Sequence, residues 1–177
     1  METQINVTRL KLVQGNIVAQ DTEAIVNAAN TGLTGGGGVD GAIHRAGGPQ
    51  IMAECRQIGG CPTGDARITG GGNLAARYVI HAVGPFYSGR TKESDLLAGA
   101  YRNSLKLAAE HGIKSVAFPS ISTGAYRYPL KDAAKIALST VRDFLQAEPH
   151  GLERVRFVLF DAKTLAAYED ALQNLTS

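Results

Sequence analysis

The sequence predicts an α/β domain in which a parallel or mixed sheet is covered by helices on both faces. Three observations lead to this fold class. Segments with strand-like alternation and segments with helical periodicity follow one another along the chain. The length of 177 residues suits one well-buried core and is short for two, so we expect a single domain over residues 1–177. A composition of 44% hydrophobic and 19% charged residues is typical of a globular chain.

The predicted strands are short. Residues 7–13 alternate between apolar Leu10 and Leu12 and charged Arg9 and Lys11, which is the pattern of a strand with one buried face. The other predicted strands are more apolar and cover residues 24–26, 66–69, 78–83, 115–118 and 155–160.

The predicted helices lie between these strands. Pro49 suits a first helical turn, where its missing N–H costs nothing, and it begins a helix over 49–58 that follows one over 39–46. Ser94 is predicted to cap a long amphipathic helix that ends at Gly112. Two more helices are predicted over 130–146 and 164–175.

Charge and hydropathy narrow the range of partners. The chain has 18 Lys and Arg against 16 Asp and Glu, and no window holds the basic run of a phosphate-backbone binder. Nucleic acid is therefore not favoured as a partner. No apolar stretch reaches the length of a membrane span, and the first residues lack the layout of a signal peptide. We expect a cytoplasmic protein without a membrane partner.

The two cysteines are predicted to be free thiols. Cys55 and Cys61 have neither the spacing of zinc ligands nor histidines nearby in the sequence, and they allow at most one disulfide. We expect neither a metal nor a cofactor.

Glycine marks the first candidate site, because 14 of the 21 glycines lie between Gly32 and Gly72. Residues 27–30 (NAAN) leave a short strand, and four consecutive glycines, 35–38, lead into a helix. Such a run costs backbone entropy, so we expect its N–H groups to approach a ligand such as a phosphate. A flexible surface loop is the alternative. Residues 36–41 also spell G-x-G-x-x-G, but they stand too far from the strand for a dinucleotide fingerprint, which argues against a dehydrogenase.

Asp40 is the first candidate for chemistry. It lies in the first turn of the predicted helix, where the helix dipole favours a carboxylate, and it can orient a water or a sugar hydroxyl. His44 follows four residues later on the same face and can pair with it. A purely structural role is the alternative for both residues.

A second candidate loop covers residues 120–126 (SISTGAY), between a strand and a helix. Its backbone amides and the hydroxyls of Ser122 and Thr123 can cradle a phosphate, and Tyr126 offers a flat face. Ordinary turn chemistry would explain these residue types as well. Because ligands bind at the carboxyl ends of strands in such sheets, we expect the two loops to meet there.

These motifs, taken in order, resemble a known family. The segments QGNI (14–17), NAAN (27–30), GGGGVDGAIH (35–44), PTG (62–64), HAVGP (81–85) and ISTGAY (121–126) look like a macrodomain of the MacroD type. The bacterial O-acetyl-ADP-ribose deacetylases are the members that the chain resembles most, from about Val7 to Leu172. The resemblance implies a three-layer α/β/α fold with a central, mostly parallel mixed sheet.

The resemblance also implies a ligand and its contacts. ADP-ribose would lie across the top of the sheet, and the enzyme would hydrolyse the ester of O-acetyl-ADP-ribose and release mono-ADP-ribose from acidic side chains of proteins. Asp40 and Asn30 would be catalytic, with Asn30 also bonded to the distal ribose. The other implied ligand contacts are Asn16 and Ile17 at adenine, Phe160 beside it, and Gly37, Gly38, Val39, Ser122, Thr123, Gly124, Ala125 and Tyr126 around the diphosphate and ribose.

One departure from the family pattern concerns adenine. The family has Asp where this chain has Asn16, and an amide oxygen accepts a hydrogen bond without the assistance of a charge.

The alternatives to a hydrolase are an ADP-ribose-binding module without catalysis, a nicotinamide-dependent oxidoreductase and an RNA-binding regulator.

Overall fold

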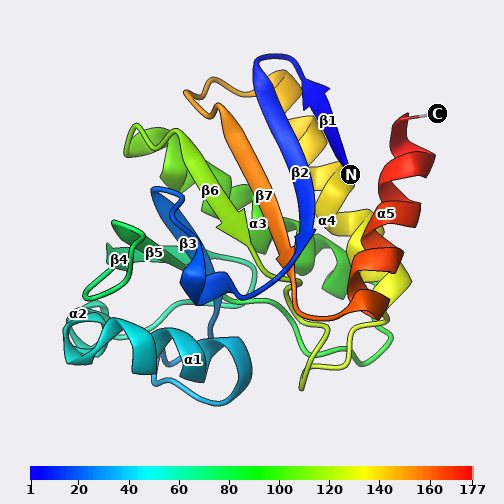
Figure 1. The fold of residues 1–177 in the computed structure, drawn as a ribbon. Helices are drawn as coiled ribbons and strands as arrows, with labels where there is room; N and C mark the ends of the chain where they lie inside the picture. Colours follow the sequence, from blue (N-terminus) through cyan, green and yellow to red (C-terminus); the bar gives the residue numbers. More distant parts are fainter. Residues whose placement is uncertain (177) are drawn as a thin grey trace.

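The computed structural model describes residues 1–176. These residues form one seven-stranded sheet with the strand order β1-β2-β7-β6-β3-β5-β4 (Figure 1). The strands are β1 (Glu2–Ile5), β2 (Thr8–Gln14), β3 (Ala24–Ala28), β4 (Ala66–Gly70), β5 (Tyr78–Ala82), β6 (Ser115–Phe118) and β7 (Arg154–Leu159). The five central strands, β2, β7, β6, β3 and β5, run parallel to one another. The edge strands β1 and β4 pair antiparallel with β2 and β5. The carboxyl ends of the parallel strands therefore share one edge of the sheet.

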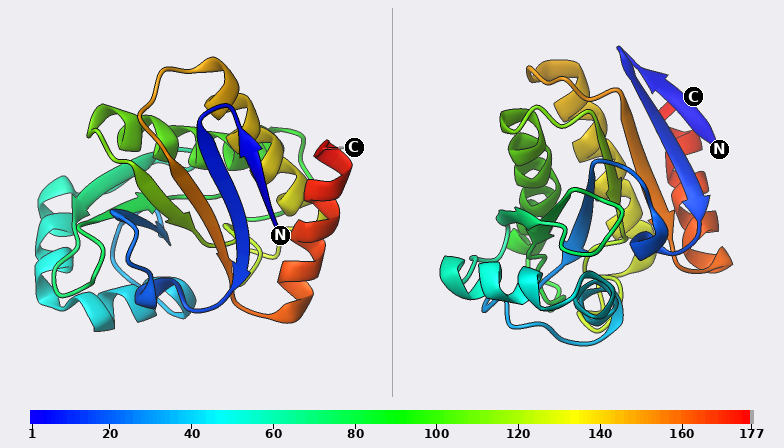
Figure 2. Two further views of the ribbon diagram at one scale, coloured as in Figure 1. Left: turned by 45° about the horizontal axis from the view of Figure 1, so that its top comes forward. Right: turned by 60° about the vertical axis from the view of Figure 1, so that its left-hand side comes forward.

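Helices cover both faces of this sheet (Figure 2). On one side α3 (Lys92–Glu110), α4 (Leu130–Ala147) and α5 (Ala162–Thr176) close the larger apolar core, which also receives side chains from β2, β6 and β7. On the other side α1 (Gly38–Gly47), α2 (Pro49–Ile58) and the short 3₁₀ helix η1 (Ile17–Ala19) close a smaller core. The predicted three-layer α/β/α class with a mixed, mostly parallel sheet is confirmed.

The alternation of side chains along β3 and β5 carries polar groups to the α1/α2 face. Ala24 and Val26 point into the larger core, and Ile25 belongs to the smaller one. Because successive side chains of a strand point to opposite faces, Asn27 follows Ile25 onto the α1/α2 face. On β5 His81 follows Val79 in the same way, and Asn27 is its direct register partner.

Most predicted elements are confirmed within a few residues, with differences at three places. Strand β1 was not predicted, because its only buried residue is Ile5 and its pairing with β2 supplies the strand. Val7 was placed in a strand but lies in a two-residue hairpin loop beside Asn6, whose φ is 52°. Asn tolerates that left-handed conformation better than most residues.

The third difference is the start of α3, where the prediction that Ser94 is the cap is wrong. The helix begins at Lys92, and the Ser94 hydroxyl donates to the Thr91 carbonyl within its first turn. The carboxylate of Glu93 instead accepts from the backbone N–H groups of Ser88, Gly89 and Arg90 and from the Ser88 hydroxyl. Glu93 thus ties the loop after β5 to the helix.

We predict that Glu93→Gln lowers the melting temperature at pH 7 and that this difference shrinks below pH 4. Hydrogen bonds from Ser88, first its hydroxyl and then its backbone N–H, lower the pKa of Glu93, so its stabilising effect is present above the ordinary glutamate pKa and is lost as the pH falls through the lower folded value. Thermal unfolding of the wild type and of Glu93→Gln at pH 7 and at pH 3 measures the difference in melting temperature.

Asp95→Asn is the matched control, because Asp95 lies exposed in the same first turn and lacks these bonds. An equal loss in both variants would mean that Glu93 acts through the helix dipole alone.

Candidate functional site

Five loops meet at the edge where the parallel strands end. The chain leaves β2 toward Asn16, β7 toward Phe160, β3 toward the glycine run, β5 toward residues 83–91 and β6 toward residues 119–129. In Figure 1, α1 and α2 lie beside these carboxyl ends. The structure therefore brings both predicted loops to the same edge, as expected for a ligand site in an α/β sheet.

The side chain of Asn30 holds the loop that contains the glycine run. Its Nδ2 donates to the Gly35 carbonyl at 2.9 Å, and its Oδ1 accepts from the backbone N–H of Thr34 at 3.0 Å. A Cβ added to Gly37 or Gly38 would meet no atom within 4 Å, and Gly38 has a φ of +57°. The backbone at the start of α1 therefore borders open space, and the positive end of the helix dipole faces it.

Asp40 lies in the first turn of α1 with only 6% of its surface exposed. Its Oδ1 accepts from Asn27 Nδ2 at 2.9 Å and lies 3.3 Å from Nε2 of His44, so the predicted pairing with His44 is confirmed. Within residues 1–176 no donor bonds the second oxygen, Oδ2, which lies on the side of Gly36. One oxygen is fixed by the protein, and the other is left for a ligand or water.

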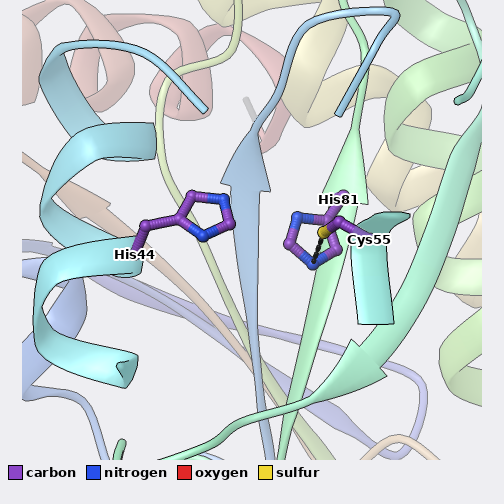
Figure 3. A group of neighbouring side chains, drawn as sticks. All are labelled: His44, Cys55 and His81. Carbon is purple, nitrogen blue, oxygen red and sulfur yellow. Dashed lines mark hydrogen bonds between the residues drawn. The ribbon is translucent and has the colours of Figure 1, made fainter. Parts of the chain in front are cut away.

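Asn27 links Asp40 to a buried polar cluster around His81, and Figure 3 shows His81 with its neighbours His44 and Cys55. The imidazole of His81 has Nδ1 at 3.1 Å from Asn27 Nδ2, while its Nε2 lies 2.9 Å from Thr69 Oγ1 and 3.7 Å from Cys55 Sγ. Burial, and then the neighbouring His44, lower the pKa of His81 to about 3, and burial raises the pKa of the Cys55 thiol to about 11. Both groups are neutral at pH 7.

Cys55 has no histidine nearby in the sequence, but the fold places two histidines beside it. Ligand atoms of His44, Cys55 and His81 lie within 4.8 Å of one another, although α1, α2 and β5 contribute one each. Such a donor set could hold a soft metal such as zinc. The hydrogen bonds of His81 do not fit a bound metal. Asn27 donates to Nδ1 of His81, so the proton of the neutral ring sits on Nε2. Nε2 would have to be the ligand atom, and a protonated nitrogen cannot bind a metal.

The second loop is held in a strained conformation at Ser122. This residue has a φ of +69°, is 6% exposed, and its buried hydroxyl has no partner within residues 1–176. A Cβ on Gly84 would collide with that hydroxyl, so the loops after β5 and β6 pack closely there. Strain and an orphaned polar group at one residue are typical of a functional site.

Aromatic side chains stand on the loops after β5, β6 and β7, with Phe86 and Phe160 exposed and Tyr126 half-buried. The rings of Phe86 and Tyr126 are 3.7 Å apart between centroids, and the Tyr87 N–H donates to the Tyr126 carbonyl at 2.9 Å. Phe86 was not predicted as a site residue, because nothing local in the sequence marks it. Phe160 follows the end of β7 and is 85% exposed.

Asn16 is the N-terminal cap of η1. Its Oδ1 accepts from the Val18 N–H at 3.2 Å, and Gln20 Nε2 donates to its carbonyl. The amide nitrogen of Asn16 has no acceptor among the described residues. Ile17 is buried beneath it in the smaller core, so only a small part of that side chain can reach a ligand.

Comparison with known proteins identifies the family. The Macro domain model matches residues 26–137. A macro domain-containing protein of Caldanaerobacter subterraneus subsp. tengcongensis is 56% identical over 172 residues, which cover 94% of this chain and 97% of that protein. The chain belongs to the macro domain family, and the predicted resemblance is confirmed at that level. Its assignment to the MacroD type remains a prediction.

Solved macrodomains have the same fold. A macrodomain of Oceanobacillus iheyensis with ADP is 43% identical and has a TM-score of 0.94, covering 99% of this chain and 96% of that one. A macrodomain of Trypanosoma brucei in complex with ADP-ribose is 44% identical with a TM-score of 0.87, covering 92% of this chain and 68% of that one.

Within residues 1–176 no helix is long and apolar enough to cross a membrane.

We predict that Ser122→Gly raises the free energy of unfolding by about 1 kcal/mol, because glycine adopts a positive φ without strain and the orphaned hydroxyl is removed. Urea denaturation measures it. Arg127→Gly relieves a φ of +61° at an exposed residue of the same loop and serves as the control. A loss of stability in Ser122→Gly alone would show that the hydroxyl has a partner in solution.

Proposed function

We propose that this chain binds ADP-ribose and hydrolyses its esters, acting on O-acetyl-ADP-ribose and removing mono-ADP-ribose from acidic side chains of proteins. One observation carries the proposal. Asp40 keeps Oδ1 bonded to Asn27, while Oδ2 lies on the side of Gly36 and has no donor within residues 1–176. The family resemblance and the ADP and ADP-ribose complexes of the two similar macrodomains support the choice of ligand.

The two loops supply the diphosphate site. Backbone N–H groups at the start of α1 face the space beside Gly37 and Gly38, and a helix N-terminus of this kind binds anions. The strained loop after β6 would close the other side, and there the buried Ser122 hydroxyl has no partner within residues 1–176. In this arrangement the diphosphate would contact Gly37, Gly38, Val39, Ser122, Thr123, Gly124, Ala125 and Tyr126.

The distal ribose would lie between Asp40 and the aromatic pair of Phe86 and Tyr126. Asn30 Nδ2 has a second N–H beyond the one it gives to Gly35, and this N–H can bond a ribose hydroxyl. Adenine would lie at the other end, over Asn16 and Ile17 and beside Phe160. The exposed ring of Phe160 suits stacking against a base.

In the proposed reaction a water held by Asp40 Oδ2 attacks the ester carbonyl carbon. The bond from that carbon to the ribose oxygen breaks, acetate leaves, and the ribose oxygen takes up a proton. A carboxylate is a weak base at neutral pH, so we assign part of the proton transfer to a phosphate oxygen of the substrate. Turnover would accordingly be modest.

We predict that Asp40→Asn slows hydrolysis of O-acetyl-ADP-ribose at least about 100-fold, the usual size of a lost acid–base contribution, and changes ADP-ribose affinity little. Chromatography of the products and calorimetry measure the two effects. Asp132→Asn, an exposed carboxylate in the first turn of α4, is the control. A wild-type protein that binds ADP-ribose without cleaving the ester would instead be a binding module.

We predict that Asn16→Asp strengthens ADP-ribose binding several-fold. One carboxylate oxygen keeps the Val18 N–H, and the other accepts from the adenine amino group with the assistance of its charge. The expected gain is on the order of 1 kcal/mol, seen in Kd and KM rather than in kcat, because adenine is remote from the ester.

The hypoxanthine analogue of the ligand lacks the amino donor and should cancel this gain. An equal gain with both ligands would show that residue 16 does not read the base.

A further inference from the structure

His81 and Asn27 form a buried polar pair in the middle of an apolar layer. They are direct register partners on β5 and β3, and both are almost completely buried. Their neighbours on the same face, Ile25 and Val79, are apolar. Burying two polar side chains here costs stability unless each finds its partners.

The hydrogen bonds of this pair have only one consistent direction. Asn27 Nδ2 has two protons, and it lies 2.9 Å from Asp40 Oδ1 and 3.1 Å from His81 Nδ1. The opposite amide orientation would place Asn27 Oδ1 against the carboxylate oxygen, so Nδ2 must face Asp40. Oδ1 of Asn27 then has no partner within residues 1–176. The Asn27 amide is therefore held only through its nitrogen, which donates to Asp40 and His81.

The hydrogen bonds of the other ring nitrogen, His81 Nε2, also have a single consistent direction. Because His81 Nδ1 accepts, the proton of the neutral ring is on Nε2, which donates to Thr69 Oγ1 at 2.9 Å. The Thr69 hydroxyl in turn donates a hydrogen bond to the Gly70 carbonyl at 3.0 Å. The chain of donors therefore runs outward from His81 and ends on the backbone of β4.

We propose that His81 is a positioning residue, which fixes the Asn27 amide through Nδ1 and thereby holds the Asp40 carboxylate with Oδ2 toward the substrate. This inference rests on the proposed function for its effect on turnover, whereas the hydrogen-bond direction can be tested without it. The groups that face the ring from the packed elements are His44 on α1, Cys55 on α2 and Thr69 on β4. The lowered pKa of His81 keeps the ring neutral above about pH 3.

Two substitutions at position 81 separate positioning from packing. In His81→Asn the side-chain oxygen can take the place of Nδ1 and accept from Asn27, whereas His81→Gln can replace Nε2 but leaves Asn27 without its acceptor. Both remove the aromatic ring, so both should lower the melting temperature to a similar extent. We expect His81→Gln to lower kcat about tenfold, the effect of roughly one lost hydrogen bond, and His81→Asn to stay within about threefold of the wild type.

Calorimetry should show ADP-ribose affinity unchanged in both variants, because the two loops that would bind the diphosphate do not contain residue 81. Equal losses of kcat in the two variants, in step with their melting temperatures, would overturn the proposal and leave His81 a structural residue.

Nitrogen NMR of wild-type His81 provides a readout that does not depend on catalysis. We expect an unprotonated Nδ1 and a protonated Nε2 between pH 5 and pH 8, unchanged by one equivalent of zinc. The reverse tautomer, or stoichiometric zinc on His44, Cys55 and His81, would overturn the proposal. If the tautomer is as expected but the wild type does not cleave the ester, the proposed function fails, and the Asn27 amide resonances in the two variants decide whether His81 holds the amide.

Discussion

The hydrogen bond from Asn27 Nδ2 to Asp40 Oδ1 joins the first turn of α1 to the middle of the sheet. It spans 2.9 Å between two buried groups, and the whole glycine loop lies between these residues in the sequence. A charge-assisted bond in a poorly solvated site is stronger than its surface equivalent, and either partner left alone there would be costly. The orientation of the Asp40 carboxylate in the first turn of α1 therefore depends on this contact.

The loops around that contact differ in how they hold their shape. The glycine loop is braced by Asn30, which acts as a donor to Gly35 and an acceptor for Thr34, and its positive φ values fall on Leu33, Gly35 and Gly38. The loop after β6 has two non-glycine residues at positive φ, Ser122 and Arg127, and it leaves the Ser122 hydroxyl unpaired within residues 1–176. Backbone strain of this kind persists only where the surrounding packing enforces it, and Gly84 is a close neighbour, since a Cβ added there would collide with the Ser122 hydroxyl.

Much of the fold could be predicted because its signals are local. The helix after Pro49 begins and ends as predicted, since proline and the following glycines mark its ends within a few residues. Strand β6 was also predicted over its full extent, because a short apolar run between turn residues suffices. The errors fall where a distant contact decides. Strand β1 exists through its pairing with β2, and α3 starts where Glu93 binds the loop before it.

The sequence by itself determined the α/β class, the family resemblance and both candidate loops, because glycine runs, hydroxyl-rich turns and apolar alternation are properties of neighbouring residues. Only the tertiary structure decided that Asn27, His81, Cys55 and Thr69 lie together behind Asp40. These residues come from β3, β5, α2 and β4, and their meeting depends on the register of three strands and on the packing of one helix across them. Register and helix packing are set by the burial of whole faces, so no spacing along the chain reveals them.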